Sequence, residues 1–134
     1  MDAAVLDANV VLRYLLGDHA ELTQKAEEII APIRSGDSLA LVPEAVIAEC
    51  VFVLFRQYRV PRGEIRELLA KFLGSRGLIG DHLPLMRNAL ELFAGSTLSF
   101  VDALVYLTAK QNNFDLVTFD EDLKKLASRP RESR

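Results

Sequence analysis

The sequence has few of the residues that mark a secreted, membrane or zinc-binding protein. Its single cysteine, Cys50, excludes an intramolecular disulfide, and its apolar neighbours indicate a small buried side chain rather than a nucleophile. The two histidines, His19 and His82, have no metal-ligand spacing around them, so we expect surface positions and no zinc site. No apolar run reaches the roughly 18 residues of a membrane span, and the start lacks the features of a signal peptide. We therefore expect a cytoplasmic protein without a membrane partner.

The sequence also lacks an excess of positive charge. Its 16 Lys and Arg residues stand against 19 Asp and Glu residues, for a net charge of −3. A nucleic-acid partner would therefore require a local basic patch or a bound cation. Residues 1–127 fit a single domain, and residues 128–134 form a short basic C-terminal tail. This tail is either a solvated end or a binding arm.

Short apolar segments alternate with longer segments of helical periodicity. Residues 3–6, 39–42 and 116–119 are typical of β-strands, and residues 77–80 are a weaker fourth candidate. Between them, the spacing of apolar residues predicts helices at 10–16, 20–34, 43–60, 62–74, 83–95, 99–113 and 121–127. The alternation predicts an α/β fold, an α/β/α sandwich with a central parallel sheet of about four to five short strands.

Four acidic residues occupy unusual positions in this pattern. Asp7 and Asp120 follow predicted strands, where ligands of parallel sheets bind, and Glu49 and Asp102 are isolated charges in apolar helical segments. The three aspartates fit helix-capping patterns equally well, and a buried salt bridge or an outward-facing position would explain Glu49. Four carboxylates brought together would repel one another unless a cation lay between them. Oxygen ligands without His or Cys suit Mg²⁺ or Mn²⁺.

The motifs that carry these acids also have a recognisable order and spacing. They are "VLDANVVLRYLLGD", "VPEAVIAECVFVL", "LSFVDALVYLTAKQNN" and "FDLVTFDEDL". Together they resemble the PIN-domain family, and within it the small VapC-type toxins of toxin–antitoxin pairs. The resemblance implies a homodimeric endoribonuclease that hydrolyses RNA phosphodiester bonds with Mg²⁺ or Mn²⁺ and is silenced by a cognate antitoxin protein. It also implies a catalytic and metal-binding quartet of Asp7, Glu49, Asp102 and Asp120.

The resemblance further assigns supporting positions to Asn9 and Thr118. Arg13, one turn past Asn9, is a candidate helper in RNA binding, or else a solvated or dimer-facing residue. The alternative function is a non-catalytic PIN-like module that binds RNA or protein. Two other classes are disfavoured: a haloacid-dehalogenase phosphatase needs a second Asp where Asn9 stands, and a receiver domain needs a strand-end lysine that the chain does not offer.

Overall fold

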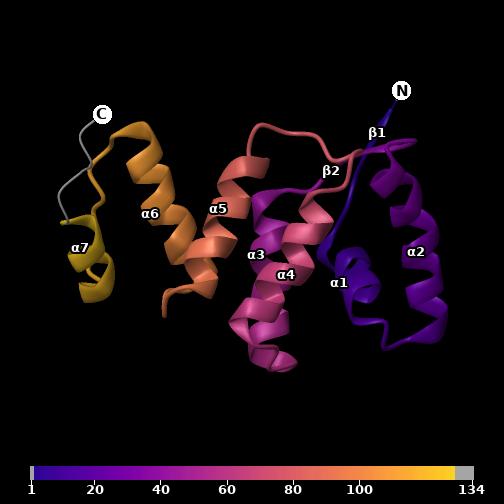
Figure 1. The fold of residues 1–134 in the computed structure, drawn as a ribbon, viewed down its shortest axis with the longest axis horizontal. Coiled ribbons are helices and arrows are strands. Elements are labelled where there is room, and N and C mark those ends of the chain that lie inside the picture. Colours follow the sequence, from indigo (N-terminus) through magenta and orange to yellow (C-terminus); the bar gives the residue numbers. More distant parts are fainter. Residues whose placement is uncertain (1, 129–134) are drawn as a thin grey trace.

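The computed structural model of the protein describes residues 2–128, so most of the predicted basic tail lies outside the described residues. The strands are β1 (Ala3–Val5) and β2 (Leu39–Leu41). The helices are α1 (Ala8–Leu16), α2 (Ala20–Ser35), α3 (Glu44–Phe52), α4 (Arg62–Leu73), α5 (Leu83–Ala94), α6 (Phe100–Asn112) and α7 (Glu121–Ala127), and a π-helical turn, η1 (Val53–Gln57), continues α3. Figure 1 shows these elements in a row, with α2 and β1 near one end of the long axis and α7 at the other.

The two strands form a parallel sheet in which Ala4 is level with Ala40. On the opposite side of β2, Ala40 donates its N–H to the carbonyl of Gly77 (2.8 Å) and accepts a hydrogen bond from the N–H of Ile79 (2.9 Å). Gly77 is required there because a Cβ atom would collide with the carbonyl oxygen of Ser38. β2 is thus flanked on both sides, whereas the outer side of β1 has no strand beside it in residues 2–128.

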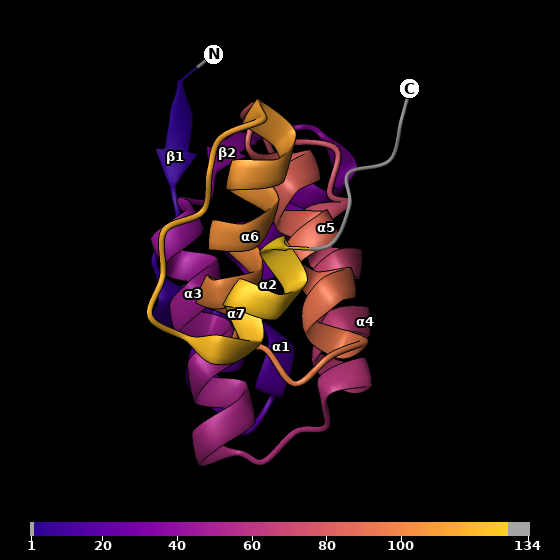
Figure 2. The same cartoon turned by 90° about the vertical axis from the view of Figure 1, so that its left-hand side faces the viewer.

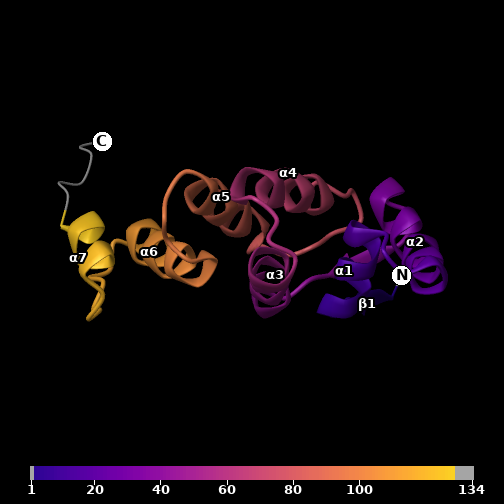
Figure 3. The ribbon, with the colours of Figure 1, turned by 90° about the horizontal axis from the view of Figure 1, so that it is seen from below.

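The sheet is smaller than the predicted four to five strands. The strands expected at 3–6 and 39–42 are confirmed, the segment 77–80 contributes one bridge, and the segment 116–119 is not a strand. That segment lies between α6 and α7, far from β1 (Figures 1 and 3), where Val117 and Phe119 are 92% and 96% exposed. An extended segment becomes a strand only when a neighbour pairs its N–H and C=O groups. The fold is therefore α/β with a parallel sheet, but helices dominate it and the predicted sandwich is incomplete.

The helix predictions are confirmed, with one change. The segment 43–60, expected as one helix, divides into α3 and the π-helical turn η1. The helix ends follow local chemistry: α1, α2 and α6 each end at a residue with left-handed backbone angles, Gly17 (φ 62°), Gly36 (φ 90°) and Asn113 (φ 57°). Glycine and asparagine are the residues that adopt this conformation most readily. Periodicity and capping therefore determine these elements locally.

One buried cluster joins α1 through α6, and its largest fully buried side chains include Ile47, Leu69, Phe72, Met86 and Phe93. α7 contributes Leu123, which is buried outside this cluster. The core thus holds α1 to α6 together and leaves α7 at its margin. No helix within residues 2–128 is both long enough and apolar enough to span a lipid bilayer.

We expect Leu69→Ala to lower the free energy of unfolding by about 2 to 5 kcal/mol, because Leu69 is fully buried and truncation leaves a cavity. Leu22→Ala is the matched control, since Leu22 is 43% exposed on α2 and its truncation should cost less than about 1 kcal/mol. Urea denaturation of both variants measures the difference. Equal costs would contradict the placement of Leu69 in the core.

Candidate functional site

Asp7 lies at the junction between β1 and α1. It is the N-cap of α1, where its Oδ1 accepts a hydrogen bond from the N–H of Val10 (3.2 Å). The side chains of Asp7 and of Asn9, in the first turn of the helix, are both exposed. Capping uses one carboxylate oxygen of Asp7 and leaves the second oxygen available to a ligand. Capping and ligand binding are therefore compatible at this position.

Glu49 is exposed on α3, so it is not a charge in buried apolar surroundings, and the outward-facing alternative for this residue is the one observed. Its neighbours at helical spacing, Ala45 and Phe52, are exposed as well, and Phe52 is 60% exposed. The buried residues of α3, including Ile47 and Cys50, lie on the other side of the helix. An apolar helical sequence does not reveal which face is covered when apolar side chains lie on both faces.

Cys50 lies where α3 contacts α1. Its Sγ is 3.9 Å from the carbonyl oxygen of Ala8. Burial and, to a smaller extent, the negative charges of Glu49 and Asp7 together raise the pKa of the Cys50 thiol to about 12. The charges of two of the four acids, Asp7 at the start of α1 and Glu49 on α3, therefore both affect the pKa of this thiol. The prediction that Cys50 is a buried, unreactive side chain agrees with its position.

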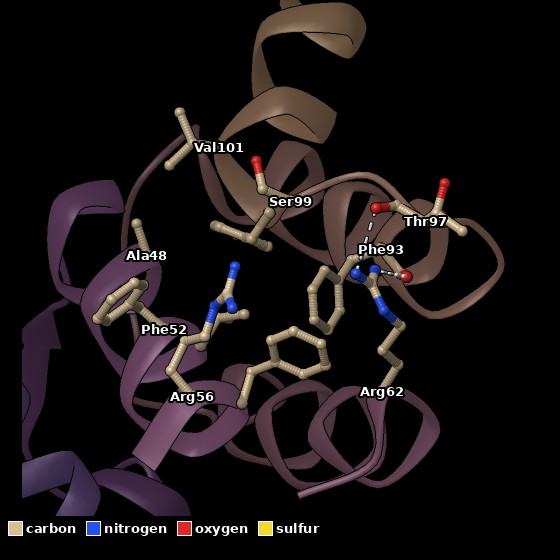
Figure 4. A pocket seen from close by; sticks show the side chains of 11 residues that line it. Ala48, Phe52, Arg56, Arg62, Phe93, Thr97, Ser99 and Val101 are labelled. Carbon is tan, nitrogen blue, oxygen red and sulfur yellow. Dashed lines mark hydrogen bonds between the residues drawn. The ribbon is translucent and has the colours of Figure 1, made fainter. Parts of the chain in front are cut away.

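Asp102 is half-buried in the first turn of α6, where its N–H donates to Oγ of the N-cap Ser99 (3.0 Å). The preceding residue, Val101, and Ala48 of α3 both line a pocket of about 240 Å³ (Figure 4). α3 and α6 therefore approach each other at positions next to Glu49 and Asp102. The acids of α1, α3 and α6 thus lie on elements that are in successive contact.

Asp120 is separate from these elements. It is the N-cap of α7, where its Oδ1 accepts from the N–H of Leu123 (2.9 Å), and its own N–H donates to Oγ1 of Thr118 (3.0 Å). Figures 1 and 3 show α7 at the opposite end of the molecule from β1. Within residues 2–128, no three Asp, Glu, His or Cys side chains are placed to hold one metal ion. The convergence of four carboxylates expected at one sheet edge is not observed in this arrangement.

Arg13 is held by neighbouring side chains at the far end of α1. Its Nη1 donates to Oδ1 of Asp18 (2.9 Å) and its Nη2 to the hydroxyl of Tyr58 (3.4 Å). The hydrogen bond to Tyr58, and next the charge of Asp18, raise the pKa of Arg13. Tyr58 completes the triangle by donating to Oδ2 of Asp18 (3.2 Å). Arg13 thus ties the end of α1 to the residue that follows η1.

The histidines have structural roles. His19 is exposed, as expected, and its Nδ1 accepts from the N–H of Leu22 (3.1 Å) at the start of α2. His82 is half-buried, contrary to the expected surface position, with Nε2 at 2.7 Å from the carbonyl oxygen of Val42. The backbone carbonyl of a distant element supplies this contact, so the sequence around His82 gave no sign of it.

Sequence reasoning missed Arg62, which lines one side of the pocket (Figure 4). Its Nη1 donates to the carbonyls of Phe93 (2.9 Å) and Leu98 (2.7 Å), and its Nη2 to that of Thr97 (3.3 Å). The guanidinium carbon also lies 4.8 Å and 4.4 Å from the ring centroids of Phe55 and Phe93. Burial lowers the pKa of Arg62. No sequence signal was available, because all of these partners come from other elements.

We expect Arg62→Lys to lower the free energy of unfolding by about 1 to 3 kcal/mol, because an ammonium group cannot reproduce the fork that meets three carbonyls. Arg66→Lys, one turn along α4, is the control, since the ion pairs of Arg66 with Glu67 and Glu91 are exposed and its substitution should change stability by less than about 0.5 kcal/mol. Urea denaturation compares the two. A stable Arg62→Lys variant would mean that the carbonyls are satisfied without the fork.

We expect the Cys50 thiol to resist iodoacetamide at about pH 8 in the folded protein and to react once the protein is unfolded. Because its folded pKa lies above the ordinary 9.0, the thiol's contribution to stability is complete below pH 9.0 and is lost as the pH rises toward about 12. Between these values the free energy of unfolding should fall more steeply for the wild type than for Cys50→Ala. Rapid alkylation of folded protein, or parallel pH profiles, would contradict this.

Comparison with known proteins places these residues in a family. A model of the PIN domain matches residues 4–129, a range that includes all four acids. The VapC ribonuclease of Aquifex aeolicus (strain VF5) is 28% identical over 123 residues, which cover 91% of this chain and 90% of that protein. No solved structure gives a significant match. The resemblance found in the sequence motifs is thus confirmed, and because the family model spans nearly the whole chain, the protein belongs to the PIN-domain family.

Proposed function

We propose that this protein is a Mg²⁺- or Mn²⁺-dependent endoribonuclease that acts as the toxin of a toxin–antitoxin pair in the cytoplasm. The observation that carries the proposal is the PIN-domain match over residues 4–129, because it spans Asp7, Glu49, Asp102 and Asp120 in one chain. The similarity to a VapC ribonuclease supports RNA as the substrate and a cognate antitoxin as the partner. A homodimer is part of the same proposal.

The donor chemistry suits a hard divalent cation. All four proposed ligands are carboxylates, and carboxylate oxygens are the ligands that Mg²⁺ and Mn²⁺ prefer. Asp7, Glu49 and Asp102 stand on elements in successive contact, whereas Asp120 must approach them to complete the set. When bound, the ion would supply a water activated for attack on phosphorus and a positive charge for the leaving oxygen.

The chain's own residues have distinct roles in this proposal. Asp7 and Asp102 are the main ligands, and Glu49 and Asp120 complete the site directly or through water. Asn9, in the first turn of α1, orients the Asp7 side of the site. Thr118 positions Asp120, because its Oγ1 accepts the backbone N–H of that residue at 3.0 Å. No protein side chain acts as the nucleophile.

Arg13 belongs to the edge of the proposed RNA-binding surface. It lies one helical turn past Asn9, and its ion pair with Asp18 holds the guanidinium in place. Neutralisation by Asp18 makes its attraction for a phosphate weaker than that of a free arginine. We therefore assign Arg13 a secondary role in binding the RNA backbone.

We expect the purified protein to cleave a susceptible RNA with Mg²⁺ or Mn²⁺, and EDTA to abolish the cleavage. Asp7→Asn and Asp102→Asn should each lower the rate by about a hundredfold or more, because a neutral amide is a poor ligand for a hard cation. Asp37→Asn is the control, since Asp37 is an exposed residue whose carboxylate accepts a hydrogen bond from Ser35. Circular dichroism and urea denaturation check that the variants fold.

Sequencing of the new RNA ends would identify the cleaved bonds. Cleavage in the presence of EDTA, or full activity in both Asp7→Asn and Asp102→Asn, would contradict the proposed mechanism. Retention of RNA without cleavage under any metal would favour the alternative, a non-catalytic PIN-like binding module.

A further inference from the structure

β1 lies at the edge of the sheet, and its side chains are exposed to solvent along the whole strand. All three of its residues, Ala3, Ala4 and Val5, are exposed, and Val5 is 69% exposed. β2 pairs with β1 on one side and with the segment around Leu78 on the other, so the open edge of the sheet is the outer side of β1. An open edge of apolar residues is a template for another strand.

The segment between α6 and α7 has the composition of a strand but lacks a strand partner in the described chain. Residues 116–119, "LVTF", have the β-branched and aromatic composition of a strand, yet no strand of the described chain pairs with them. Val117 and Phe119 are almost fully exposed, at 92% and 96%. Large apolar side chains two positions apart are seldom both exposed to this degree unless a partner covers them.

The C-terminal arm, residues 114–128, is too far from its own β1 to cover it in this arrangement. In Figures 1 and 3, α6, α5 and α3 lie between the arm and β1. The arm is attached at Asn113, the C-cap of α6, and α6 is fixed to the core by its buried residues Phe100 and Ala103. In Figures 1 and 2, the segment before α7 and β1 nevertheless run in the same direction, from the top of the view downward.

We propose that two copies of this chain exchange their C-terminal arms, so that residues 116–119 of one copy add a parallel strand to the outer edge of β1 of the other. Such an exchange is closed by a two-fold axis, since each copy gives one arm and receives one. It covers Val5 of one chain with Val117 and Phe119 of the other, and it satisfies the backbone groups of both edges.

The exchange also accounts for the separation of the acids, and in this respect it rests on the proposed function. Asp7 follows the end of β1, and Asp120 follows the end of the segment 116–119. Parallel neighbours end at the same edge of a sheet, so the arm of the second copy brings its Asp120 toward Asp7. Each site then takes Asp7, Glu49 and Asp102 from one chain and Asp120 from the other.

Cross-linking tests the arm position without any measurement of activity. Chains with Val5→Cys or Val117→Cys are co-expressed with different tags, isolated as mixed pairs and treated with a short bis-maleimide, while the buried Cys50 stays unreactive. We expect a covalent dimer of the two variants. Ile29→Cys, at a 45% exposed position on α2, replaces Val117→Cys in the control and should give none.

The same reagent, applied to the double variant Val5→Cys/Val117→Cys, shows whether the arm beside β1 comes from a second copy or from the same chain. Covalent dimers support exchange. An internally linked monomer would show that the arm folds back onto its own β1 and would overturn the proposal. The absence of any cross-link, in this variant and in the mixed pairs, would also overturn it.

Complementation gives a second test that separates the exchange from the enzymatic proposal. Co-expressed Asp7→Asn and Asp120→Asn chains should recover about a quarter of wild-type cleavage, because half of the randomly formed dimers are mixed and one of the two sites in each is intact. Co-expressed Asp7→Asn and Asp102→Asn chains are the control and should recover no cleavage. Asp7 and Asp102 of each site come from the same chain, so every site in a mixed dimer lacks one of them. If the wild type cleaves RNA but the mixture of Asp7→Asn and Asp120→Asn chains does not, the arm exchange is wrong and the ribonuclease proposal stands.

If the wild type does not cleave RNA, the ribonuclease proposal is wrong, and the cross-linking experiment still decides whether the arms exchange.

Discussion

The parallel pairing of β1 with β2 is the interaction on which the other features of this protein depend. The N–H of Leu6 continues the pairing by donating to the carbonyl of Leu41 (3.1 Å), so the chain leaves the sheet at Asp7 and enters α1 there. α1 then packs on α3 through Ala8 and Cys50. The same pairing uses one side of β1 and leaves the other open. The pairing of these two strands thus fixes the position of Asp7 and leaves the outer edge of β1 open.

Electrostatic repulsion limits how the acids can be arranged. Carboxylates that are close together without a cation raise one another's free energy. In the structure Asp7 and Asp120 each cap a helix, Glu49 is exposed, and Asp102 lies half-buried in a first helical turn. Asp7 and Asp120 therefore each have a local role that does not require a cation. Because capping takes one oxygen of a carboxylate, the local role of Asp7 does not conflict with the proposed one.

Predictions from sequence succeeded where the cause is local and failed where it is not. Helical periodicity gave the helices, since turns of a helix bond within their own segment. The strand expected at 116–119 failed because a strand needs a partner from elsewhere. The burial of Glu49 was misjudged for a similar reason, because composition does not tell which face of a helix another element covers. Arg62 was missed because its three carbonyl partners come from other elements.

The sequence by itself determined the helices, the first two strands, the buried thiol of Cys50 and the family. Each of these follows from local periodicity and composition or from the order of the motifs along the chain. Only the tertiary structure decided that Glu49 faces solvent, that Arg13 is tied to Asp18 and Tyr58, and that Asp120 stands apart from Asp7. These outcomes depend on contacts between segments distant in the chain. Such contacts are set by the sum of packing and hydrogen bonding over the whole molecule, which no local pattern encodes.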